Sequence, residues 1–154
     1  MVCTLLLIVR QGEGETTVRV ILLMAAVLAV AGQAEARSKA TQYLVDQQIS
    51  DACNGGEGSI AESGLVERDL TGDGRDDLII DHAGIQCDGA GMSGFCGAQV
   101  CSLLIYVRRG DLLKLEVDSL GTVLEISNDP VPVLSVAGHG ANRATLRWDG
   151  KRFR

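Results

Sequence analysis

A run of carboxylates and glycines between two apolar segments is the part of the sequence best equipped for chemistry. Residues 69–81 read DLTGDGRDDLIID. Counted from Asp69, acidic residues fall at positions 1, 5, 8 and 9, and Gly74 stands at position 6. Calcium prefers several oxygen ligands that converge from one short loop, with a glycine where the chain turns sharply. The spacing therefore predicts a loop between two strands that can hold a cation.

This stretch resembles the calcium loops of FG-GAP and VCBS repeats and of dockerins, written D-x-N-x-D-G-x-x-D. In this sequence position 3 is the neutral Thr71, and position 12 is Ile80 where an EF-hand has a bidentate glutamate. The resemblance therefore implies a weak calcium site with a structural role. It implies side-chain ligands at four positions and a backbone carbonyl at the fifth: Asp69, Thr71, Asp73 and Asp77, and the carbonyl of Arg75. The alternative is a glycine-rich turn whose aspartates accept backbone N–H groups.

Cysteine usage predicts covalent cross-links. Cys3 lies in the predicted leader described below, which leaves an even set of four: Cys53, Cys87, Cys96 and Cys101. An even set in an exported protein is typical of a disulfide framework. Four cysteines allow three connectivities, and the sequence selects none of them. We favour Cys53–Cys87, which joins a helix end to a strand end, and Cys96–Cys101, which closes a short loop. The alternative, a four-cysteine zinc site, lacks the usual C-x2-C pairs.

Two histidines, His82 and His139, are the other residues that could take part in catalysis. His82 with Asp88, or His139 with Ser135, could form a base or an activated hydroxyl. The sequence shows no catalytic triad, and both histidines stand in segments typical of turns. We therefore expect no enzyme, and keep as the alternative a small periplasmic hydrolase that uses His82 or His139 with nearby carboxylates.

The elements that must position these residues follow from hydrophobic periodicity. Ser38 is a favourable N-cap for a helix over residues 39–52, where apolar residues recur at helical spacing. Beyond the helix the pattern changes to strands. Glycine turns at 72–74 and at 110–111 predict two hairpins, and further strands are expected in TVLEIS, VLSVAG and ATLRWD. The predicted fold class is α+β: an N-terminal helix packed on an antiparallel sheet of β-hairpins, with two disulfides.

The N-terminal 36 residues have the pattern of a leader and signal peptide. Arg19 precedes an apolar core over residues 20–31, and Ala34-Glu35-Ala36 has the form of a cleavage site. The apolar core is shorter than the roughly 20 residues that span a bilayer. We therefore expect a mature chain that starts near Arg37, forms a single α+β domain over 37–154, has no membrane span after cleavage, and is periplasmic or secreted.

The charge of the chain bears on its partners. The formal net charge is −6, which argues against nucleic-acid binding. The acidic loop, the pattern C…FCG…C from Cys87 to Cys101 and the closing LRWDGKRF also resemble a class of small exported bacterial proteins of unknown function. That resemblance implies no activity. We expect a binding module whose partner is an unknown protein or a component of the cell envelope.

Overall fold

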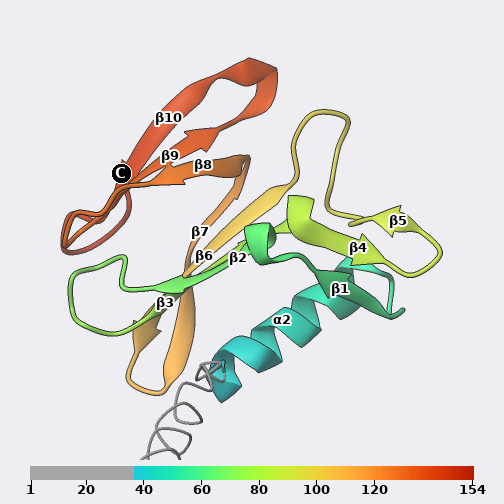
Figure 1. Ribbon diagram of the computed structural model, residues 1–154, viewed down its shortest axis with the longest axis horizontal. Coiled ribbons are helices and arrows are strands. Elements are labelled where there is room, and N and C mark those ends of the chain that lie inside the picture. The colour runs from blue at the N-terminus through green and yellow to red at the C-terminus, as the bar shows by residue number, and fades with distance from the viewer. Residues whose placement is uncertain (1–36) are drawn as a thin grey trace, which may run out of the picture. The chain divides into compact units, whose positions relative to one another are not determined.

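The predicted helix begins and ends where its sequence signals place it. In the computed structural model, which describes residues 37–154, helix α2 spans Lys39–Ala52 (Figure 1). The side chain of Ser38 caps it by accepting the backbone N–H of Thr41 at 3.1 Å. The predicted leader, signal peptide and cleavage point, all within residues 1–36, lie outside the described residues.

A four-stranded antiparallel sheet forms the middle layer and contains both predicted hairpins. Its strand order is β2-β3-β6-β7. The bounds are Leu65–Arg68 for β2, Asp77–Asp81 for β3, Ser102–Arg109 for β6 and Leu112–Leu120 for β7. The acidic loop joins β2 to β3, and the turn at Gly110 joins β6 to β7.

The central strands β3 and β6 are buried on both faces, because α2 lies on one side of the sheet and a second sheet on the other (Figure 1). Along β3, Leu78 and Ile80 join a core cluster with Val45 of α2. Ile79 points to the opposite face and joins a cluster with Leu134 of the second sheet. A strand buried on both faces needs apolar residues at consecutive positions, which explains the unbroken LII of β3.

The second sheet has the order β10-β9-β8 and is also antiparallel. Its strands are β8 (Thr122–Ile126), β9 (Val133–Ala137) and β10 (Arg143–Arg147). After β10 the chain turns back, and Trp148 pairs with Phe153 in an isolated bridge. These segments match the strands expected from TVLEIS, VLSVAG and ATLRWD.

A third, small sheet and three 3-10 turns complete the described part of the chain. The sheet has the order β1-β4-β5, with bounds Gly58–Ile60, Ile85–Cys87 and Gly91–Met92. The turns are η1 (Glu62–Gly64), η2 (His82–Gly84) and η3 (His139–Ala141). Cys53, at the end of α2, is bonded to Cys87, at the end of β4, and the second disulfide joins Cys96 to Cys101.

The α+β class, the antiparallel pairing and both favoured disulfides are confirmed. The expectation of one sheet is wrong, since the strands divide among three sheets. The physical reason is that β3 and β6 carry apolar residues on both faces, so a second layer of strands must cover the face that α2 leaves open. Within residues 37–154, no helix is both long enough and apolar enough to cross a membrane.

Candidate functional site

Asp69 holds the acidic loop together by accepting hydrogen bonds from the backbone that follows it. Its Oδ1 accepts the N–H groups of Thr71 at 3.0 Å and Gly72 at 2.6 Å, and its Oδ2 accepts the N–H of Gly74 at 2.7 Å. Partial burial raises the pKa of Asp69, but these bonds, with one from Asp73, outweigh it and lower the pKa. The first candidate ligand is therefore a carboxylate around which the turn is wrapped.

Asp73 lies at the exposed tip of the loop and is paired with its neighbour Arg75. The guanidinium Nη2 donates to Asp73 Oδ2 at 2.7 Å, and the backbone N–H of Arg75 donates to Oδ1 at 3.0 Å. The side-chain hydrogen bond from Arg75 is the main reason that the pKa of Asp73 is lowered. The Arg75 side chain, which the calcium-loop pattern does not use, thus takes up one of the expected ligands.

Asp77 begins β3 and is buried, with both carboxylate oxygens occupied. Oδ2 accepts the N–H of Leu70 at 2.9 Å, and Oδ1 accepts the N–H of Arg108 at 2.8 Å. Burial raises the pKa of Asp77, and the nearby charges of Asp73 and Asp69 raise it further, against the two hydrogen bonds. The two hydrogen bonds therefore do not fully offset the cost of burying the charged carboxylate next to Asp69 and Asp73.

Arg108 ties the acidic loop to α2. Its Nε donates to the carbonyl oxygen of Asp76 at 2.8 Å, and its Nη2 donates to the Ser38 side chain at 3.0 Å. The start of the helix and the end of the loop are therefore fixed to the same residue of β6. Arg108 lies 31 residues from Asp77, and no local pattern in the sequence indicates the contact.

The arrangement of the loop bears on whether calcium fits it. In residues 37–154, no three or more His, Cys, Asp or Glu side chains are grouped so that they could hold a metal ion. The carboxylates of Asp69 and Asp77 face backbone N–H groups, and that of Asp73 faces Arg75. Calcium would require Arg75 to release Asp73 and the loop oxygens to turn inward. The loop shows the contacts expected of the turn, and calcium binding stays a prediction.

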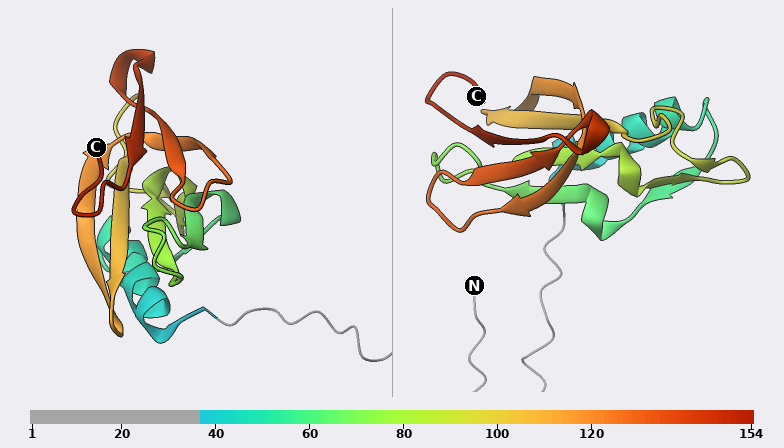
Figure 2. Two further views of the ribbon diagram at one scale, coloured as in Figure 1. Left: turned by 90° about the vertical axis from the view of Figure 1, so that its left-hand side faces the viewer. Right: turned by 90° about the horizontal axis from the view of Figure 1, so that it is seen from above.

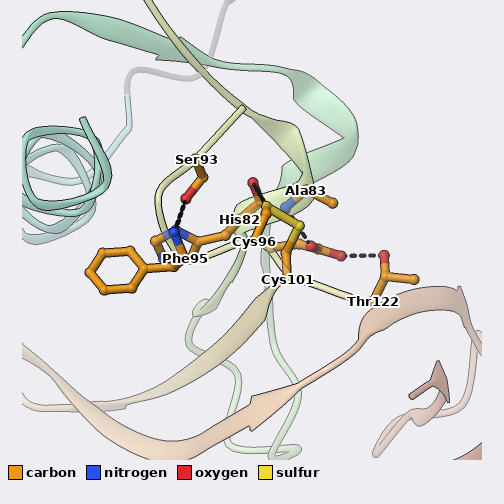
Figure 3. Close-up of a disulfide and its surroundings, with 8 residues drawn as sticks. His82, Ala83, Ser93, Phe95, Cys96, Cys101 and Thr122 are labelled. Carbon is orange, nitrogen blue, oxygen red and sulfur yellow. Dashed lines mark hydrogen bonds between the residues drawn. A yellow bond between two sulfur atoms is a disulfide. The ribbon is translucent and has the colours of Figure 1, made fainter. Parts of the chain in front are cut away.

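A second polar cluster lies just beyond the other end of β3 and is built around His82. Its Nδ1 lies 2.9 Å from Ser93 Oγ, and its Nε2 lies 3.0 Å from Gln48 Oε1. Phe95 packs edge-on against the ring at 5.1 Å between centroids, and His82 and Ser93 are both buried. Figure 3 shows the Ser93 hydroxyl directed at the ring, with the Cys96–Cys101 disulfide beside it. The cluster thus joins α2, η2 and the loop before β6.

The hydrogen bonds assign the tautomer of His82. The Gln48 carbonyl oxygen can only accept, so Nε2 carries the proton and Nδ1 accepts from the Ser93 hydroxyl. Ser93 Oγ in turn accepts the N–H of Phe95 at 3.1 Å. Burial lowers the pKa of His82, against the charges of Asp81 and Asp118, which raise it. His82 is therefore held neutral by a network of uncharged partners.

The Cys96–Cys101 disulfide and Asp81 surround the same turn. Cys96 Sγ lies 3.6 Å from the carbonyl oxygen of His82. The Asp81 side chain accepts the N–H of Ala83 at 2.9 Å and is also hydrogen-bonded to the Thr122 hydroxyl (Figure 3). The hydrogen bond to Asp81 and the contact with Cys96 thus hold the backbone of η2, and Thr122 in turn holds the Asp81 side chain.

Neither pairing predicted for the histidines is present. The ring of His82 bonds Ser93 and Gln48, and not Asp88, because the chain between them runs out along β4 and returns at Ser93. His139 lies exposed in η3, and the hydrogen bond described for it is at its carbonyl, which accepts from Asn142 at 3.1 Å. Sequence reasoning missed Gln48, which stands on a helix with no local signal for a polar contact.

No family model, curated protein or solved structure matches the chain. The fold and the two clusters define a disulfide-linked α+β protein with one acidic turn and one buried histidine.

Proposed function

We propose that the protein is an exported interaction module of the periplasm or the extracellular space. Its partner is another protein or an envelope component. The observation that carries the proposal is that the buried His82 gives both ring nitrogens to neutral side chains, the buried Ser93 and the half-buried Gln48, and so serves the fold. The two disulfides support export, because such bonds persist in oxidising compartments. We also propose that the acidic loop takes a structural calcium ion through Asp69, Thr71, Asp73, Asp77 and the carbonyl of Arg75.

Exposed apolar side chains support binding to a partner. Tyr43 on α2 is 67% exposed and Met92 in β5 is 63% exposed. Phe95, which directly precedes the disulfide loop, is also exposed. Tyr, Phe and Met are enriched at protein interfaces, and aromatic side chains bury a large area at low entropic cost. These three residues are the first places where a partner should be sought.

The hydrolase alternative finds no support in the contacts of the histidines. A general base needs a ring nitrogen within reach of the substrate proton, and His82 is buried with a relative exposure of only 1%. The nucleophile that a hydrolase would pair with it, Ser93, is buried and accepts a backbone N–H. A panel of chromogenic ester, phosphate and peptide substrates should show no turnover that depends on His82 or His139. Turnover that is lost in His139→Ala or His82→Gln would favour the enzyme.

Export is tested at the N-terminus. The protein should be expressed from its full coding sequence and recovered from the cell envelope or the medium. Intact mass spectrometry should find a chain that begins at Arg37. Recovery of the exported protein with residues 1–36 still attached would contradict processing at Ala36, and recovery only from the cytoplasm would contradict export.

Partner binding is tested by photo-crosslinking in the producing cell. A photoreactive phenylalanine analogue should replace Tyr43, Met92 or Phe95, one at a time, with the exposed Glu125 as the matched control position. We expect a discrete adduct with another cell component from at least one apolar position and none from the control. The proposal fails if none of the three apolar positions gives an adduct while the protein is present and folded.

A further inference from the structure

Strand β7 is the longest edge strand in the described part of the chain. Within residues 37–154 it pairs with β6 on one side and with no strand on the other. It has nine residues, whereas the other edge strands have five or fewer: β1, β2, β5, β8 and β10. The left view of Figure 2 shows β7 on the outside of its sheet. A long free edge offers a row of unpaired N–H and C=O groups that can accept another strand.

Large apolar side chains lie along this edge. Leu112 is 72% exposed and Leu115 is 42% exposed. Leu115 pairs with Tyr106, so it stands on the face of the sheet that α2 covers elsewhere. Side chains of this kind on a free edge favour association.

The charges of β7 select the strand that would pair with it. Lys114 Nζ lies 3.4 Å from Glu116 Oε1, so both side chains stand on one face, opposite to Leu115. The two charges are separated by a single residue. An antiparallel copy of β7 that crosses at Leu115 therefore brings Lys114 of each chain opposite Glu116 of the other. Opposite charges on directly facing strands stabilise the pair, and like charges destabilise it.

The backbone of β7 accommodates this crossing. Its register against β6 shifts between Ile105 and Tyr106, so that β7 carries one extra residue, Glu116, at a bulge. In a two-fold pair each Lys114 faces the bulge of the other chain, which leaves the alternation of faces intact on both sides of the axis. Charges and bulges commonly protect an edge against foreign strands. Here the charges and the bulge of β7 are complementary to those of a second, antiparallel β7.

We propose that two copies of this chain associate through β7, antiparallel about a two-fold axis at Leu115, to join their four-stranded sheets into one. The association is isologous, as in most homodimers. It rests on one strand from each copy, which is a small contact area, so we expect a weak, concentration-dependent dimer. The acidic loop and the partner that Tyr43, Met92 and Phe95 would contact are not needed for it.

The dimer is tested by sedimentation velocity on the oxidised protein over about 1 μM to about 1 mM. The weight-average mass should rise toward twice that of the monomer. Leu115→Asp should remain a monomer throughout. Leu124→Asp is the matched control, because Leu124 is 45% exposed on β8 against 42% for Leu115. It should dimerise as the wild type does. A wild type that is monomeric at the highest concentration, or equal behaviour of the two variants, overturns the proposal.

A charge exchange tests the register. Lys114→Glu places two glutamates opposite each other in a homodimer, and Glu116→Lys places two lysines opposite each other. Each variant alone should therefore dimerise at least ten-fold more weakly than the wild type. Mixed together they restore both opposite pairs, so native mass spectrometry of an isotope-labelled mixture should find the heterodimer in excess over both homodimers. A statistical mixture contradicts the Leu115 axis. Because Glu116 is partly buried, circular dichroism must first show that its variant is folded, and Leu115→Asp tests the dimer without it.

Discussion

Strand β3 has the acidic loop at its first residue and the histidine cluster just after its last, and the two clusters are satisfied by different kinds of partner. In the acidic loop, Asp69 takes its hydrogen bonds from backbone N–H groups two to five residues away. At the other end, His82 takes its bonds from Gln48 and Ser93, which lie 34 and 11 residues away. The tip of the acidic loop is closed by its own turn, and only its end, at Asp76 and Asp77, bonds the distant Arg108. The histidine cluster is assembled by the fold.

The difference separates what each cluster can do. The acidic loop gathers negative charge near the surface, and after burial the charges of Asp73 and Asp69 raise the pKa of Asp77, so a cation in the loop would relieve repulsion among the carboxylates. In the histidine cluster His82 and Ser93 are buried, and both ring nitrogens of His82 already have neutral partners, so a cation gains nothing there. We therefore expect the acidic end to respond to cations and the histidine end to respond to acid and to loss of packing.

The largest effect is expected from the disulfides, which cross-link the histidine end. Replacing Cys53 and Cys87 together by serine should lower the free energy of unfolding by about 4 kcal/mol, because the bond closes a loop of 34 residues. Replacing Cys96 and Cys101 should cost about 2 kcal/mol, because that loop spans 5 residues. Denaturant unfolding of both variants measures the two values. Equal losses would contradict loop closure as the source of the stabilisation.

The next effect is expected from His82 itself. His82→Ala should lower the free energy of unfolding by about 3 kcal/mol, since it opens a cavity and leaves Gln48 and Ser93 without partners. Asp73→Ala is the comparison at the acidic end and should cost much less, because Asp73 is exposed at the tip of its loop. Urea unfolding of the two variants checks the order. A smaller loss for His82→Ala than for Asp73→Ala would reverse the comparison.

A pH dependence should mark the histidine end. The pKa of His82 is lower in the folded than in the unfolded protein, where it is near 6.5. The unfolded state therefore binds more protons below that value, so stability is full above about pH 7 and falls as pH drops through 6.5. The loss ends once the pH is below the pKa of the folded state.

This dependence is measured by urea unfolding between about pH 8 and about pH 5.5. His82→Gln should flatten the curve across that range. Asp77 acts in the opposite direction at lower pH, because its raised pKa makes protonation favour the folded state. A wild-type curve that stays level between pH 8 and 5.5 would show that His82 does not titrate as the fold requires.

The sequence predicted local features well. Ser38 and the apolar spacing of residues 39–52 define the helix, and the glycine turns define the hairpins, because caps and turns depend on neighbouring residues. The two favoured disulfides are present, but the sequence alone left three connectivities open, and only the packed fold selects this one. The division into three sheets did not follow, because it depends on which faces meet in space.

In the candidate site, too, local contacts could be predicted and contacts between distant residues could not. The acidic turn could be predicted from D-x-T-G-D-G, since each of its hydrogen bonds lies within a few residues. The partners of His82 could not, because Gln48 and Ser93 meet it only after α2, η2 and the loop before β6 have packed together. The same holds for Arg108, whose contact with Asp77 depends on the pairing of β3 with β6.

A small effect on calcium binding is expected from removal of the Arg75 side chain at the acidic end. Its guanidinium competes with a cation for Asp73. Arg75→Ala should therefore strengthen calcium binding, by about three- to ten-fold, while its carbonyl remains available as a ligand. Isothermal titration of wild type and variant with calcium measures the ratio. Weaker binding by the variant would mean that the side chain assists the loop.

Thermal unfolding against calcium concentration tests the central claim that the acidic end is a cation site and the histidine end is not. With a dissociation constant of about 10⁻⁴ to 10⁻³ M, 10 mM calcium should stabilise the wild type by roughly 1.4 to 2.7 kcal/mol. Magnesium should do less, because a loose loop does not enforce its octahedron. His82→Gln should keep the calcium shift, and Asp73→Ala should lose it. If 10 mM calcium leaves the melting temperature of the wild type unchanged, the loop is only a turn and the claim is wrong.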